Sequence, residues 1–204
     1  FGRMLEAKFR PYFQQHVLPA LEVFEEVDAK NGRVLDLGCG NGWYLRELAV
    51  SYANLTGVGV DAMEESIEEA RRAAEEKGLE SRLGFESTDI FEYRPERRFE
   101  VVVLNRTLHH LWGRRDELFE TVDAALAETG TLILWEPAWP ARREQLRQPN
   151  RRMLASRNLA EHAMGNRLLE PDEIRRALEG RGYQVEIRPL DDVETLLVAG
   201  RGEG

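Results

Sequence analysis

Short apolar runs alternate along the chain with longer segments in which apolar residues recur every three or four positions. The runs are typical of buried strands and occupy residues 33–38, 55–60, 82–86, 99–104 and 131–135, the third being the weakest. Helical spacing appears at residues 42–53, 64–77 and 116–127, and again from residue 170. This alternation predicts five β-α units that form a mostly parallel sheet with helices on both faces.

The two ends of the chain depart from this alternation. The first thirty residues have helical spacing, which Pro11 and Pro19 are expected to divide into shorter pieces. Residues 183–188 and 195–199 predict two final strands with too few residues between them for a crossover helix. We therefore expect a C-terminal antiparallel hairpin and, in all, a Rossmann-like α/β fold with a seven-stranded sheet.

A single domain covering residues 1–204 is expected from the length of the chain. Hydrophobic residues make up 42% of it and charged residues 32%, as in soluble globular proteins. No apolar run approaches the roughly 20 residues that span a bilayer. The one cysteine, Cys39, allows no internal disulfide and no site built on several thiolates, so we expect a cytoplasmic protein without a metal site.

Charge is distributed unevenly along the chain. The formal net charge is −9, which argues weakly against a nucleic-acid partner. Residues 140–168 hold seven arginines and two acidic residues, which gives +5 there and −14 for the remainder. These arginines have two interpretations: they attract a carboxylate or phosphate on a substrate, or they form a solvated helix that pairs with the acidic remainder.

A glycine-rich turn follows the first predicted strand, over residues 36–42 (Asp-Leu-Gly-Cys-Gly-Asn-Gly). Gly38, Gly40 and Gly42 let the backbone turn sharply and approach a ligand. A dinucleotide fingerprint needs glycine or alanine one position further on, where this chain has Trp43, and no Gly-Lys-Ser/Thr follows for a P-loop. The turn therefore indicates a nucleotide-like ligand other than a dinucleotide, or a tight turn with no ligand.

The second predicted strand ends in Asp61, where a carboxylate can accept hydrogen bonds from both hydroxyls of a ribose. The alternative is that Asp61 caps the helix that begins near Glu64. Met63 could lie on a purine face or simply pack.

Further polar residues follow the third and fourth strands. Asp89 could accept a hydrogen bond from an adenine amino group while Ile90 covers the ring, or it could form a local Asx-turn. Asn105 ends the fourth strand and precedes a Leu-His-His-Leu element.

Together these segments resemble the class I S-adenosylmethionine-dependent methyltransferases. The resemblance rests on residues 34–42, 58–62, 88–90, 108–111 and 130–134, and extends from about residue 33 to the final strand. Within that family, the chain is most similar to the small-molecule methyltransferases related to quinone-biosynthesis enzymes. It implies an N-terminal helical cover over residues 1–30 and a helical cap over residues 138–169.

The resemblance also implies roles for individual residues. Gly38, Gly40 and Gly42 would line the methionine part of S-adenosylmethionine, and Asp36 would help to hold its amino group. Asp61, with Ala62 and Met63 after it, would hold the ribose end; Asp89 and Ile90 would hold the adenine, and Asn105 would face the cofactor. The family's Asn/Asp-Pro-Pro-Tyr motif is absent, because Arg106-Thr107-Leu108 follows Asn105. A base or glutamine substrate is thereby disfavoured.

The expected function is transfer of a methyl group to a small organic acceptor, which carries a carboxylate or phosphate if the arginines face it. His109 and His110 are the candidate general bases, and a purely structural role is the alternative. A non-catalytic subunit that binds S-adenosylmethionine is the main alternative function. Aminopropyl transfer is disfavoured by the arginine-rich segment, and nicotinamide chemistry by Trp43.

Overall fold

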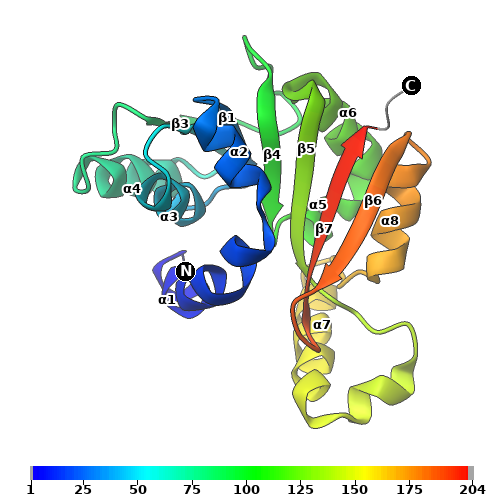
Figure 1. The fold of residues 1–204 in the computed structure, drawn as a ribbon. Helices are drawn as coiled ribbons and strands as arrows, with labels where there is room; N and C mark the ends of the chain where they lie inside the picture. The colour runs from blue at the N-terminus through cyan, green and yellow to red at the C-terminus, as the bar shows by residue number, and fades with distance from the viewer. Residues whose placement is uncertain (1, 202–204) are drawn as a thin grey trace.

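A seven-stranded sheet forms the centre of the molecule, which a computed structural model describes for residues 2–201 (Figure 1). Its strands are β1 (Arg33–Leu37), β2 (Thr56–Asp61), β3 (Leu83–Ser87), β4 (Phe99–Asn105), β5 (Leu126–Pro137), β6 (Tyr183–Pro189) and β7 (Glu194–Arg201). They lie in the order β3-β2-β1-β4-β5-β7-β6. The first five are parallel, and β7 runs antiparallel to both β5 and β6. The predicted fold class and C-terminal hairpin are confirmed.

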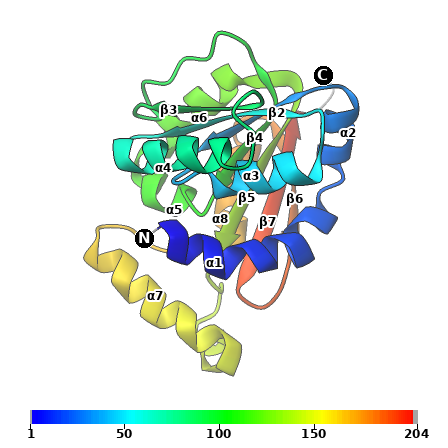
Figure 2. The same ribbon diagram turned by 90° about the vertical axis from the view of Figure 1, so that its left-hand side faces the viewer.

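Helices cover both faces of the sheet. They are α1 (Gly2–Tyr12), α2 (Val23–Ala29), α3 (Trp43–Ser51), α4 (Glu64–Glu75), α5 (Leu108–Leu111), α6 (Arg115–Ala125), α7 (Arg152–Ala163) and α8 (Pro171–Glu179), with short turns of other helix types between them. Figure 1 shows α2, α3 and α4 on one face, and α6 and α8 on the other. Figure 2 shows α1 along the lower edge of the sheet and α7 projecting beyond it.

The N-terminal segment is helical in pieces, as the prolines predict. Pro11 lies inside the last turn of α1, and the chain continues as a π-helical turn over Phe13–Val17. Pro19 lies in the first turn of a 3-10 helix over Leu18–Ala20, a position where its missing N–H costs no hydrogen bond. Phe1 and residues 202–204, the two ends of the predicted domain, lie outside the described residues.

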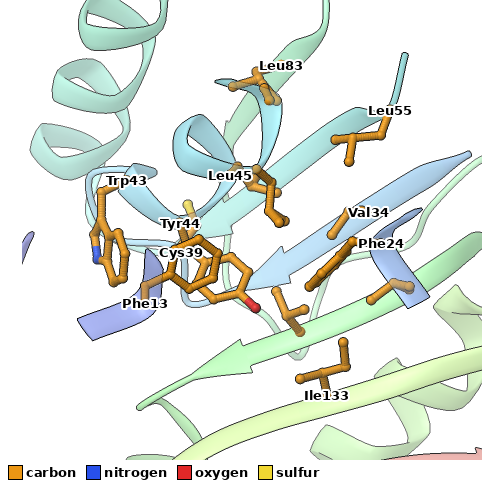
Figure 3. Packing of buried hydrophobic residues seen from close by; sticks show 14 of the residues in the cluster. Phe13, Phe24, Val34, Cys39, Trp43, Tyr44, Leu45, Leu55, Leu83 and Ile133 are labelled. Atoms are coloured by element: carbon orange, nitrogen blue, oxygen red, sulfur yellow. The ribbon is translucent and has the colours of Figure 1, made fainter. Parts of the chain in front are cut away.

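Two hydrophobic cores lie on opposite faces of the sheet. One packs α1 to α4 against the sheet and contains Phe13, Phe24, Trp43 and Tyr44 (Figure 3). The other packs α6 and α8 and includes Phe119 and Ile174. Because β1 and β4 are buried on both faces, apolar residues follow one another in Val34-Leu35 and in Val101–Leu104 rather than alternating with polar ones.

Two features differ from the sequence prediction. The connection from β3 to β4 holds no α-helix among its described residues, and only turns link the two strands. β5 begins at Leu126, directly after α6, although helical spacing was predicted up to residue 127 and the strand only from residue 131. The register of β4 against β5 shifts here, because Phe99 pairs with Leu126 and Val101 with Thr131, so the extra residues between Leu126 and Thr131 bulge out of β5. Within residues 2–201, no helix is both long and apolar enough to cross a bilayer.

Candidate functional site

A pocket of about 300 Å³ opens at the carboxyl ends of β1, β2 and β4. This is the edge of a parallel sheet at which ligands bind in doubly wound folds, next to the point where the strand order reverses. Its walls come from α1 and from the residues that follow the three strands: Gly2, Leu5, Phe9, Gly38, Cys39, Gly40, Asn41, Trp43, Asp61, Met63, Asn105, Arg106, Thr107 and His110.

The glycines of the turn after β1 have different surroundings and therefore different structural roles. Gly38, Gly40 and Gly42 all have positive φ, at 79°, 53° and 69°. A Cβ on Gly40 would meet no protein atom within 4 Å, so this glycine borders open space. A Cβ on Gly42 would lie 2.4 Å from the Phe85 ring, which makes Gly42 a packing position outside the pocket lining.

Asp61 connects the turn after β1 with the end of β2. Its Oδ2 accepts the N–H of Gly40 at 2.9 Å, and its Oδ1 accepts the N–H of Met63 at 2.9 Å. The structure begins α4 after Met63 without a side-chain cap, so the helix-capping alternative for Asp61 is wrong. Each carboxylate oxygen keeps a second lone pair, which can accept a hydroxyl hydrogen of a ligand.

Three buried acceptors in or near the turn lack hydrogen-bond partners, namely Asp36 Oδ1, Asn41 Oδ1 and Asn105 Oδ1. Asp36 is 1% exposed, and burial together with the nearby Asp61 charge raises its pKa to about 8. Buried acceptors are normally satisfied, so these three fit a ligand that brings donors such as an amino group. The open space beside Gly40 and the carboxylate of Asp61 likewise fit an adenosyl compound with a methionine part.

The sequence-predicted cofactor residues are only partly gathered at the pocket. Gly38, Gly40, Asp61, Met63 and Asn105 line it. The others do not border it; these are Asp36, Gly42, Ala62, Asp89 and Ile90.

Asp89 and Ile90 have local roles in the structure. Asp89 accepts the N–H of Phe91 at 2.9 Å, which is the Asx-turn alternative. Ile90 packs in the core beneath α6 and α8.

Arg106 lines the pocket and was not singled out from the sequence. It has a positive φ of 59°, unusual for a side chain with a Cβ. Its guanidinium forms a buried ion pair with Glu194 and lies 4.0 Å from the centre of the Phe9 ring. Its Nη2 is buried without a hydrogen-bond partner. The only local signal was a charged residue directly after a strand.

The two histidines occupy different positions. His110 lines the cofactor pocket, whereas His109 is 1% exposed and lies behind it. His109 Nδ1 is 2.5 Å from Oε2 of Glu136, whose Oε1 accepts the N–H of Leu108 at 2.8 Å. Burial disfavours protonation of His109, but the carboxylates of Glu136 and Glu161 outweigh it, so its pKa lies above the usual value.

The arginine-rich segment lies away from the cofactor pocket. Within residues 2–201, the lining of that pocket includes none of its seven arginines. Arg151 and Arg167 pair with Asp192 and Glu173 of the acidic remainder, and Arg157 lies 3.9 Å from Glu161 of the same segment. The other four are exposed. The paired arginines favour the interpretation of a solvated segment.

Comparison with known proteins gives independent support for the family to which this chain belongs. Residues 28–182 match the family model described as "Methyltransferase domain". A trans-aconitate 2-methyltransferase of Mycolicibacterium gilvum is 35% identical over 104 residues, which are 50% of this chain and 38% of that protein. The chain spans between about a third and about half of the length of the curated relatives it matches.

Solved structures share the fold. An O-methyltransferase family protein from Burkholderia thailandensis superposes with a TM-score of 0.73 at 23% identity, over 92% of this chain and 56% of that one. The DhpI–SAH complex superposes with a TM-score of 0.67 at 20% identity, over 99% of this chain and 92% of that one. With the family match, the strand order and the residues at the strand ends, the chain belongs to the methyltransferase domain family, among the class I S-adenosylmethionine-dependent methyltransferases.

Proposed function

We propose that this chain transfers a methyl group from S-adenosylmethionine to a small organic acid. The proposal of an acidic acceptor rests on Arg106, whose Nη2 is buried at the pocket wall without a hydrogen-bond partner. A planar guanidinium offers parallel N–H donors that match a carboxylate. The relative named trans-aconitate 2-methyltransferase supports an acidic acceptor, because its name specifies one.

The bound cofactor would supply a methyl group that its sulfonium already activates. We place its ribose at Asp61, its amino group at Asp36 and Asn105, and its methionine part along Gly38 and Gly40. We also propose that Asp89 and Ile90 contact the adenine. These contacts require the turn at residues 88–91 to face the pocket when the cofactor is bound.

The protein's own task is then to align the acceptor and to exclude water. Leu5 and Phe9 of α1 close one side of the pocket with apolar surface. Alignment of two reactants in this way contributes up to about 7–11 kcal/mol in favourable cases. A carboxylate is ionised at neutral pH and needs no base, so His110 would orient it by a hydrogen bond. If the acceptor were a hydroxyl, His110 rather than the enclosed His109 would take its proton.

A methyl-transfer assay with labelled S-adenosylmethionine tests this proposal over matched panels of carboxylic acids, phenols and quinols. We expect acids to be methylated. Methylation of phenols alone would refute the acid while leaving methyl transfer in place. Tight cofactor binding with no product from any panel would favour the non-catalytic subunit.

An Arg106→Lys variant tests whether Arg106 binds the acid group of the acceptor. Lysine keeps a charge for Glu194 but removes the spare nitrogen, so KM for the acid should rise roughly tenfold or more while the affinity for S-adenosylmethionine changes little. Arg114→Lys is the matched control, because Arg114 also pairs with a glutamate, Glu117, and also lies over a phenylalanine ring, that of Phe91. An unchanged KM in Arg106→Lys would contradict the assignment.

A further inference from the structure

Three side chains with metal-ligating atoms meet beside the cofactor pocket, where α7 approaches α5. His109 Nε2 lies 3.5 Å from Glu161 Oε1, and His110 Nδ1 lies 3.5 Å from Glu161 Oε2. One ligand atom from each residue lies within 4.8 Å of the other two. The two histidines are consecutive on α5, and Glu161 comes from the far end of α7.

The atoms that face one another in this cluster are acceptors. Glu136 holds His109 at Nδ1, so the neutral imidazole carries its proton there and keeps a lone pair on Nε2. His109 Nε2 and Glu161 Oε2 are both buried without a hydrogen-bond partner. A lone pair and a carboxylate oxygen that converge in a buried space are stabilised by a cation between them, either a shared proton or a metal ion.

We propose that His109 Nε2, His110 Nδ1 and the Glu161 carboxylate bind one divalent transition-metal ion of the zinc class. Two imidazoles and a carboxylate are a ligand set that such ions favour, and three protein ligands leave a position open. Metal–ligand bonds of about 2.0–2.1 Å in a tetrahedral arrangement place ligand atoms about 3.4 Å apart, close to both separations seen here. Glu136 is the outer carboxylate that orients a metal-binding histidine.

Two further side chains, those of Asn166 and Arg157, lie next to the proposed ligands and would have to move when the ion binds. Asn166 Nδ2 lies 3.1 Å from His110 Nδ1, and Arg157 Nε lies 3.9 Å from Glu161 Oε1. Rotation of the Asn166 amide would exchange its NH2 group for Oδ1, an oxygen ligand. Access is through a second pocket of about 410 Å³, whose walls include His109, His162 and Asn166.

The sequence predicted no metal site, because a single cysteine offers no thiolate cluster and the histidines lie next to no other ligand in the chain. The ligands proposed here lie about fifty positions apart and converge only in the fold. The site takes Nδ1 of His110 and leaves its Nε2–H free to donate to an acceptor. It is therefore compatible with a carboxylate acceptor, which needs no base.

Zinc titration of the full chain, stripped with a chelator beforehand, tests the proposal without any substrate. We expect one equivalent of Zn²⁺ to bind in calorimetry and in competition with a chromophoric chelator, and Co²⁺ to give the absorption of a tetrahedral site. Glu161→Gln and His110→Ala should weaken Zn²⁺ binding at least about 100-fold, and Glu136→Gln about 10–100-fold. His162→Ala, next to Glu161 on the same helix, should bind as the wild type does.

Circular dichroism and the affinity for S-adenosylhomocysteine are measured on the same preparations. Variants that keep both but lose zinc support the site. The metal site would be refuted if the wild type bound no stoichiometric zinc, or if Glu161→Gln bound zinc as well as the wild type does. Either result would show that the cluster is an ion network held together by a proton. Cofactor binding that persists in that case leaves the proposed methyl transfer standing.

Discussion

Arg106 and Glu194 are 88 positions apart in the sequence and form a buried ion pair at the edge of the pocket. Trp135 Nε1 also donates to Glu194, at 2.9 Å, and the Arg106 guanidinium lies against Phe9 of α1. The pair therefore joins the ends of β4, β5 and β7 to the N-terminal helix. Burial raises the pKa of Glu194 despite the opposing effect of Arg106, so we assign the pair to positioning more than to stability.

Glu194→Ala should lower the free energy of unfolding by about 3 kcal/mol, because it leaves a buried guanidinium and an indole N–H without partners. The control is Glu186→Ala, which removes an exposed partner of Arg188 and should change stability by less than about 0.5 kcal/mol. Urea denaturation measures both. Equal effects of the two substitutions would show that the buried pair does not organise the pocket edge.

The glycines of the first turn offer a test that separates binding from folding. Gly40 and Gly78 both have positive φ, and a Cβ on either meets no protein atom within 4 Å. Alanine at each position should cost about 1 kcal/mol of stability. Only Gly40→Ala should also weaken S-adenosylmethionine binding, since Gly40 lines the pocket. Gly42→Ala should destabilise more than either, because its Cβ would lie 2.4 Å from the Phe85 ring. Thermal unfolding and calorimetry together decide this.

The pKa of Asp36, raised to about 8 by burial and by Asp61, makes stability depend on pH. The folded state holds a proton on Asp36 that the unfolded state has lost above about pH 4, so this residue makes stability fall as pH rises from about 4 to 8. Asp36→Asn should remove that slope and raise stability at pH 8 by on the order of 1 kcal/mol or more. Denaturation at pH 5 and pH 8 measures the difference. A slope that is the same in the wild type and in the Asp36→Asn variant would show that Asp36 is ionised in the fold.

The same residue should release a proton when the cofactor binds. An ammonium group beside Asp36 favours its charged form, so affinity should rise between pH 6 and pH 7.5, by up to about tenfold per pH unit. Calorimetry in buffers of different ionisation enthalpy counts the released protons. The Asp36→Asn variant should bind more weakly and release none, and proton release that persists there would contradict the placement of the amino group.

Much of the fold could be predicted because its signals are local. Buried parallel strands give continuous apolar runs, as in Val101 to Leu104, and helices give the three-to-four spacing. Prediction failed where tertiary pairing outweighs local signals. Thr129-Gly130 has the sequence of a helix end, yet it lies inside β5 because pairing of Phe99 with Leu126 extends the strand.

The site divides in the same way. Gly38, Gly40 and Asp61 were predictable because each follows a recognisable strand at a fixed distance. Arg106 and Glu161 were not, because their roles depend on partners brought from distant parts of the chain, such as Glu194 and His109. A left-handed backbone at Arg106 has no signature in the sequence.

Calorimetric titration with S-adenosylmethionine, S-adenosylhomocysteine and NAD is the sharpest test of the cofactor assignment. We expect both adenosyl compounds to bind and NAD not to bind. Asp61→Asn should lower adenosyl affinity about 100-fold through the two ribose hydrogen bonds to a charged group, whereas Asp172→Asn, on the exposed face of α8, should bind as the wild type does. Tighter binding of NAD would refute the cofactor, and adenosyl affinity that Asp61→Asn leaves unchanged would refute the ribose role of Asp61.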